Sequence, residues 1–172
     1  MELPKRKSIR LKDYDYSQNG AYFITICTHN RECLFSDIVG ATLCGRPNNP
    51  QILMEKWLLE LENKFENIKI DKYVVMPNHI HLIITICREC VECIPPQKDK
   101  TKALLPKIIQ TFKSSVTKEI IQTETRYAYN ARPTIWQSRF HEHIIRNKES
   151  YQQIWQYIDT NPLKWSMDCY HS

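Results

Sequence analysis

A pair of histidines separated by one residue is the pattern in this sequence that most strongly suggests a chemical role. His79 and His81 open an apolar run that extends to Ile86. Alternate side chains of a β-strand point to opposite faces, so both imidazoles lie on the same face of the strand. Neutral imidazole is a common ligand of divalent metals. The spacing therefore indicates half of a metal site, although a His-x-His pair is also compatible with an ordinary surface or cross-strand pair.

The other face of the same strand is entirely apolar. It carries Ile80, Leu82, Ile84 and Ile86. An unbroken stripe of this kind is typical of a strand packed on a hydrophobic core. The histidine face is then available for another role.

Further strands and helices are needed to position these histidines. The patterns of apolar residues predict strands and helices in chain order at 21–28, about 50–67, 68–76, 79–86, about 104–122 and 140–146. The first helix has Asn48 or Asn49 as its cap and Pro50 at its first position. The β-α-β-β-α-β order predicts an α+β fold of the ferredoxin-like type, in which two helices cover one face of an antiparallel sheet.

A final helix is predicted at 148–160, capped by Asn147 and ended by Pro162. The side chains that must face the sheet are Tyr151, Ile154, Trp155 and Ile158. Tyr157 lies about 110° around the helix from the centre of this stripe. Asn161 follows one turn later, so the two side chains project as neighbours. A tyrosine at such a border is often only packing, but it can also serve as a nucleophile.

Composition narrows the class of protein. The chain has 172 residues and a net charge of +5, and no apolar run is long enough to span a membrane. We expect a single domain over 1–172, with a basic arm at 1–18 and a variable loop at 87–100, in a cytoplasmic protein without a membrane partner. Only three glycines are present, which excludes a glycine-rich phosphate or dinucleotide loop.

The seven cysteines are an odd number, which indicates reduced thiols in a cytoplasm. Cys87, Cys90 and Cys93 have the spacing of overlapping C-x-x-C units. A structural zinc site would need a fourth ligand, and the sequence leaves that alternative open.

Three segments resemble a known family when they are taken together. The segment 75–82 (VMPNHIHL) resembles the His-hydrophobic-His signature of the HUH single-strand DNA transposases. The segments 140–147 (FHEHIIRN) and 157–162 (YIDTNP), with Trp136-Gln137 before them, resemble the REP-associated tyrosine transposases, chromosomal relatives of the IS200/IS605-type enzymes. The resemblance covers roughly residues 8–165.

The resemblance implies a role for each matching residue. His79 and His81 would be metal ligands, Tyr157 the nucleophile, and Asn161 the third ligand, at a position where the IS200/IS605 enzymes have glutamine. The implied cofactor is Mg²⁺ or Mn²⁺, of which Mn²⁺ better suits two imidazoles. The implied reaction is metal-dependent cutting and joining of single-stranded DNA near palindromic hairpins of the REP type, through a 5′-phosphotyrosine intermediate.

Cations and an aromatic ring are candidates for contacting DNA phosphates and bases. They are Lys5, Arg6, Lys7, Arg10, Trp136 and Arg139. Trp136 could equally lie in the core. The N-terminal cations could equally belong to a solvated tail.

Two other functions compete with a strand transferase. One is a binding module of the same fold that holds DNA or RNA hairpins without cutting them. The other is a metal-dependent hydrolase in which water attacks and Tyr157 is structural. The chain could be a monomer or a homodimer. The short connection at Arg146-Asn147 favours a tyrosine that reaches the metal site of its own subunit.

Overall fold

The protein is built around a four-stranded antiparallel sheet. The structure is a computed structural model and describes residues 18–35, 50–87, 104–123 and 133–167. The strands are β1 (Gly20–Cys27), β2 (Ile68–Met76), β3 (His79–Ile86) and β4 (His141–Ile145). Their order across the sheet is β2-β3-β1-β4, so the histidine strand β3 occupies a central position.

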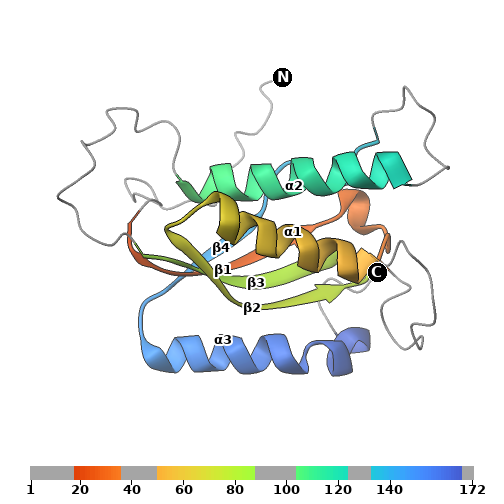
Figure 1. Cartoon of the computed structure of the whole chain (residues 1–172). Coiled ribbons are helices and arrows are strands. Elements are labelled where there is room, and N and C mark those ends of the chain that lie inside the picture. The colour runs from red at the N-terminus through yellow and green to blue at the C-terminus, as the bar shows by residue number, and fades with distance from the viewer. Residues whose placement is uncertain (1–17, 36–49, 88–103, 124–132, 168–172) are drawn as a thin grey trace, which may run out of the picture.

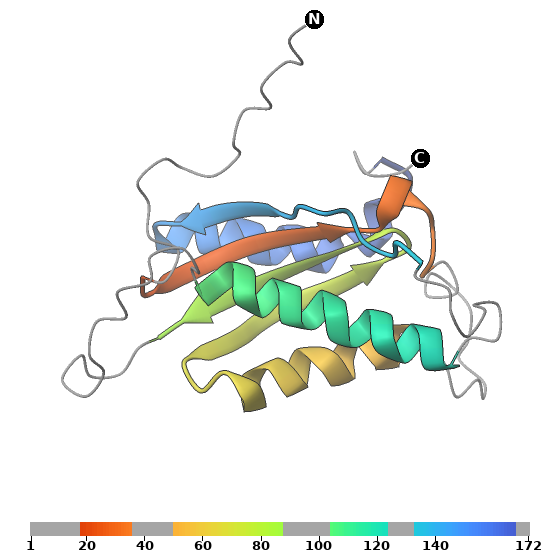
Figure 2. The same ribbon diagram turned by 90° about the horizontal axis from the view of Figure 1, so that it is seen from above.

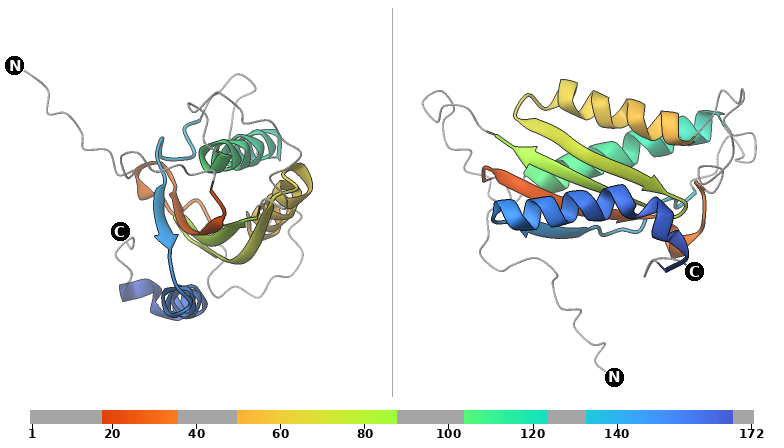
Figure 3. Two further views of the ribbon diagram at one scale, coloured as in Figure 1. Left: turned by 90° about the vertical axis from the view of Figure 1, so that its left-hand side faces the viewer. Right: turned by 90° about the horizontal axis from the view of Figure 1, so that it is seen from below.

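Helices cover both faces of this sheet. Helices α1 (Pro50–Lys64) and α2 (Leu104–Thr123) lie side by side on one face, and α3 (Lys148–Thr160) lies on the other (Figures 1 and 2). The end-on view in Figure 3 shows these three layers. The order β1-α1-β2-β3-α2-β4 and the mixed α+β architecture agree with the prediction from the sequence.

The element boundaries differ from the predicted ones by a few residues. Helix α1 ends at Lys64 rather than near residue 67, because the chain must turn there to enter β2. The amide of Ile68 bonds to the carbonyl of Phe65 at 3.2 Å in this turn. The predicted cap of α1 at Asn48 or Asn49 lies outside the described residues.

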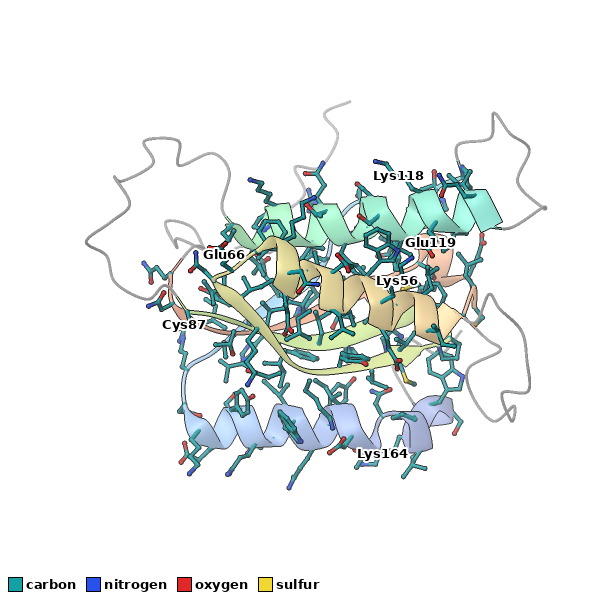
Figure 4. All side chains as sticks on the ribbon, in the orientation of Figure 1. Lys56, Glu66, Cys87, Lys118, Glu119 and Lys164 are labelled. Atoms are coloured by element: carbon teal, nitrogen blue, oxygen red, sulfur yellow. The ribbon has the colours of Figure 1, made fainter. Side chains whose placement is uncertain are left out.

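The main core lies between the sheet and helices α1 and α2. The predicted apolar face of β3 is fully buried there, as Ile80, Leu82 and Ile84 show. The two helices are also joined at their surface, where Lys56 of α1 and Glu119 of α2 form an ion pair at 2.8 Å (Figure 4).

Trp136 belongs to this core and not to a DNA-binding surface. Its side chain is 7 % exposed, and its ring packs on those of Phe35 and Phe112 with centroid distances of 5.6 and 6.0 Å. Its indole N–H donates to the carbonyl of Lys113 at 3.2 Å. Base stacking needs an exposed ring face, so the expectation that Trp136 stacks on DNA is corrected.

Helix α3 packs on the opposite face through a smaller apolar cluster. Ile83 of β3, Ile145 of β4 and Ile158 of α3 are buried at its centre. Asn147 caps the helix as predicted, because its side chain accepts a hydrogen bond from the amide of Ser150 at 2.8 Å. Figure 4 shows that side chains from the helix and the sheet fill the space between them.

Several expectations fall partly or wholly outside the described residues. The predicted basic arm, with Lys5, Arg6, Lys7 and Arg10, lies outside them. So do Cys90 and Cys93 of the possible zinc site. Cys87 is described and is exposed. Among the helices of the described part, none is long and apolar enough to cross a membrane.

Candidate functional site

His79 and His81 meet on the α3 side of the sheet. Both side chains are almost completely buried, and their ring centroids are 4.4 Å apart. The two Nε2 atoms face each other at 3.0 Å. The predicted shared face of the two histidines is therefore present, and it is covered by other residues rather than open to solvent.

The turn before β3 determines which ring nitrogen of His79 carries the proton. Asn78 is fully buried, and its Nδ2 donates to the carbonyl of Arg31 at 3.1 Å. This contact orients the amide so that Oδ1 faces Nδ1 of His79 at 2.8 Å. A carbonyl oxygen only accepts, so Nδ1 of His79 carries the proton and Nε2 presents a lone pair to the site.

His81 has a more adaptable partner. Its Nδ1 lies 2.8 Å from the hydroxyl of Thr25, which directly pairs with it across β1 and β3. A hydroxyl can donate or accept, so it supports either tautomer of His81. With Nδ1 protonated, the Nε2 atoms of both histidines present lone pairs to the same point.

Burial keeps His81 neutral. Desolvation lowers the pKa of His81 well below its usual 6.5, and the nearby His79 and His141 lower it further. A neutral imidazole is the form that binds a metal. The ring of Phe23 stacks on His81 at a centroid distance of 5.2 Å and contributes to this apolar environment.

The histidine pair fits a divalent cation. Their Nε2 atoms are 3.0 Å apart on one face of the sheet, so both imidazoles could bind the same ion. Within the described residues, no group of three or more His, Cys, Asp or Glu side chains could hold a metal. Among the described residues, a further protein ligand would therefore be an amide, hydroxyl or carbonyl oxygen.

Tyr157 reaches this pair from α3. Its Oη lies 3.2 Å from Nε2 of His81, and its ring meets that of His81 at a centroid distance of 5.2 Å. The side chain is also 40 % exposed. The phenol oxygen therefore lies beside the histidines of its own chain, in a residue that remains partly accessible to solvent.

Asn161 lies on the same side of the sheet. It is the C-cap residue of α3 and is 3 % exposed. The short helix η3 (Pro162–Met167) follows, and Trp165 within it lies 5.9 Å from the ring of His79. Asn161 thus comes between two residues that contact the histidine pair.

A tightly wound loop supports the turn before His79. Helix η1 (His29–Arg31) contains two consecutive residues with positive φ, Asn30 at 52° and Arg31 at 59°. Such a conformation is costly for residues other than glycine and is often found near functional sites. Here it places the Arg31 carbonyl against Asn78.

The structure brings together three of the predicted site residues, His79, His81 and Tyr157, and Asn161 lies one helical turn after Tyr157 at the end of α3. Arg139 is exposed before β4, while the N-terminal cations are not described. The sequence patterns predicted no role for Asn78 and Thr25. The position of Asn78 directly before His79 was a usable signal, but Thr25 is recognisable only from the strand register.

Comparisons with known proteins find two similar sequences in one organism. A Haemophilus influenzae protein of uncharacterised function is 36 % identical over 173 residues, covering 95 % of this chain and 91 % of the relative. A second protein of that organism, named as a REP-associated tyrosine transposase, is 25 % identical over 152 residues, covering 87 % of this chain and 74 % of the relative. The sequence is therefore similar to that of a REP-associated tyrosine transposase.

A solved structure extends the likeness to the fold. The structure of a REP-associated tyrosine transposase bound to a REP hairpin matches with a TM-score of 0.59 and 21 % identity, covering 98 % of this chain and 76 % of the other. At that identity the match concerns the fold. No protein-family model matches the sequence.

Proposed function

We propose that this protein cuts and rejoins single-stranded DNA beside hairpins, with Tyr157 as the nucleophile. The observation that supports this most directly is the position of the Tyr157 Oη, 3.2 Å from Nε2 of His81 in a pair of buried histidines. The similarity to a REP-associated tyrosine transposase and the hairpin bound to the structurally similar protein support the choice of DNA as substrate.

His79, His81 and Asn161 would hold a divalent cation, either Mg²⁺ or Mn²⁺. When bound, the cation supplies positive charge that stabilises the additional negative charge of the phosphate in the transition state. The two imidazoles favour Mn²⁺ on intrinsic grounds. Asn78 and the Thr25 hydroxyl keep the rings oriented toward the site.

Tyr157 performs the covalent step. Its Oη attacks the phosphorus, a new O–P bond forms, and the bond from phosphorus to the 3′ oxygen breaks. The phenol proton leaves to solvent at the exposed side of the ring, and the departing 3′ oxygen takes up a proton from water. The product is a 5′-phosphotyrosine and a DNA end with a 3′-hydroxyl, and attack by a 3′-hydroxyl reverses the step.

The DNA has to approach from the accessible side of Tyr157. Arg139 is an exposed cation suited to contacting a phosphate. Lys5, Arg6, Lys7 and Arg10 remain candidates for the same task. Trp136 is excluded by its place in the core.

The test is the capture of the covalent intermediate. Single-stranded hairpin oligonucleotides from repeats near the gene, labelled at either end, are incubated with the protein and Mn²⁺ and run on a denaturing protein gel. We expect a band that retains the 3′ label, requires metal, and is lost in Tyr157→Phe. Tyr73→Phe is a matched control, because Tyr73 packs on the opposite face of the sheet.

Two outcomes would favour the competing functions. Cleaved DNA without an adduct, at a rate unaffected by Tyr157→Phe, would indicate a hydrolase. Tight hairpin binding with neither product would indicate a binding module.

A further inference from the structure

Strand β2 contains an irregularity directly opposite helix α3. Ile70 pairs with Ile84 and Lys72 pairs with Ile83, so Asp71 is an extra residue and forms a β-bulge. Bulges change the direction of side chains and are common next to active sites.

The bulge places two charged neighbours on the same face. Ile70 and Tyr73, which flank them, both pack on the main core. In a regular strand only one of two intervening residues could point away from that core. Here both Asp71 and Lys72 point toward α3, as their contacts with that helix show.

Asp71 is fixed in place and bonds to the first half of α3. The hydroxyl of Thr85 on β3 donates to its carboxylate at 2.5 Å. Tyr151 of α3 also forms a hydrogen bond with this carboxylate. The contact ties the beginning of the helix to the sheet.

Lys72 holds the second half of α3, close to the nucleophile. Its ammonium forms an ion pair with Asp159 and lies 4.9 Å from the ring centroid of Trp155. Trp155 and Asp159 are each two residues from Tyr157, one on either side. The lysine side chain is 26 % exposed and the aspartate side chain 52 %, so solvent screens this pair in part.

The apolar contacts of α3 do not by themselves define its position sharply. Ile158 is the single buried residue of the helix, and the other apolar side chains that face the sheet are half-buried. A small apolar patch is not directional, so it tolerates sliding or rotation of the helix. The ion pair and the hydrogen bond from β2 depend on direction, so they fix the position and rotation of α3 on the sheet.

We propose that Lys72, presented by the Asp71 bulge, is a positioning residue that holds the Tyr157 turn of α3 against the histidine pair through Asp159 and Trp155. The inference deepens the proposed function and rests on it for its catalytic consequence. Its structural part, the placement of α3, can be measured without DNA cleavage.

The test is a charge exchange between β2 and α3. Lys72→Glu, Asp159→Lys and the double variant are compared with the wild type for the first-order rate of adduct formation at saturating hairpin and Mn²⁺. We expect each single variant to be about 5- to 20-fold slower, with hairpin affinity changed less than twofold. The double variant restores the ion pair with reversed charges and should recover to within about threefold of the wild type.

Lys69→Glu is the matched control. Lys69 faces the same side of β2, is 76 % exposed, and pairs with Asp71 at 3.6 Å rather than with the helix. Its substitution makes the same change in charge and should leave the rate within twofold. If Lys72→Glu does not fold, Lys72→Met is used in its place, because methionine keeps most of the side-chain length over Trp155.

Hydrogen exchange separates this inference from the proposed function. Amides of 155–161 should exchange faster in Lys72→Glu and return toward the wild-type rate in the double variant, whether or not the protein cuts DNA. A wild type without adduct would overturn the proposed function alone. Single variants that exchange and react like the wild type, or a double variant no better than its parents, would overturn the role of Lys72.

Discussion

Asn78 should control metal affinity without touching the metal. It is 0 % exposed, accepts from Nδ1 of His79 at 2.8 Å and donates to the carbonyl of Arg31 at 3.1 Å. The substitution Asn78→Ala removes both bonds and leaves the His79 ring without its orienting acceptor. Loss of such a partner typically weakens metal binding by about 10- to 100-fold, or about 1.4 to 2.7 kcal/mol.

The fold also loses stability in this variant. The buried Nδ1 of His79 loses its partner, which costs about 1 to 3 kcal/mol when it is not satisfied otherwise, whereas Arg31 is an exposed residue. Calorimetric titration with Mn²⁺ and urea unfolding of the apo protein measure the two effects separately.

A second variant distinguishes orientation from general damage. Asn78→Asp keeps an acceptor for His79 but places an oxygen against the Arg31 carbonyl. We expect it to lose stability while retaining Mn²⁺ affinity within about threefold. A folded Asn78→Ala protein that binds Mn²⁺ as tightly as the wild type would refute the argument, and so would equal weakening in both variants. A wild type that binds no Mn²⁺ would instead contradict the proposed metal site.

Three further predictions concern stability. Trp136→Ala should lower the free energy of unfolding by about 3 to 5 kcal/mol in urea titrations, because a large ring leaves the core, and a loss of hairpin affinity without a loss of stability would contradict its place there. Burial lowers the pKa of Lys113 from 10.5 to about 8. Between those values the unfolded chain holds the proton and the folded chain does not, so the free energy of unfolding should rise with pH from 8 to 10.5. This rise should be absent in Lys113→Met, and an identical pH dependence would show that another group causes it. Asn147→Ala should cost about 1 kcal/mol through the loss of the α3 cap, measured by thermal unfolding with the exposed Gln153→Ala as control, and equal stabilities of the two variants would argue against the cap.

Local patterns were sufficient to predict most of the fold. The apolar stripe of β3, the cap at Asn147 and the stop at Pro162 each depend on neighbours in the sequence. The predicted end of α1 was wrong by a few residues, because the helix ends where the chain must turn to enter β2 and the place of that turn depends on the tertiary structure. Trp136 was left open between core and surface, since an aromatic residue outside a regular element has no periodicity to assign its face.

The sequence by itself determined which residue types are present and which of them share a face. His79 and His81 had to lie on the same side of their strand, and Tyr157 and Asn161 had to be neighbours on their helix, because strand and helix periods are properties of the backbone. Only the tertiary structure decided that Tyr157 meets the two histidines. It also decided that Asn78 orients His79, and that a bulge at Asp71 directs Lys72 to the helix with the tyrosine. Those contacts join residues far apart in the chain, and they depend on strand register and helix placement, which no local pattern encodes.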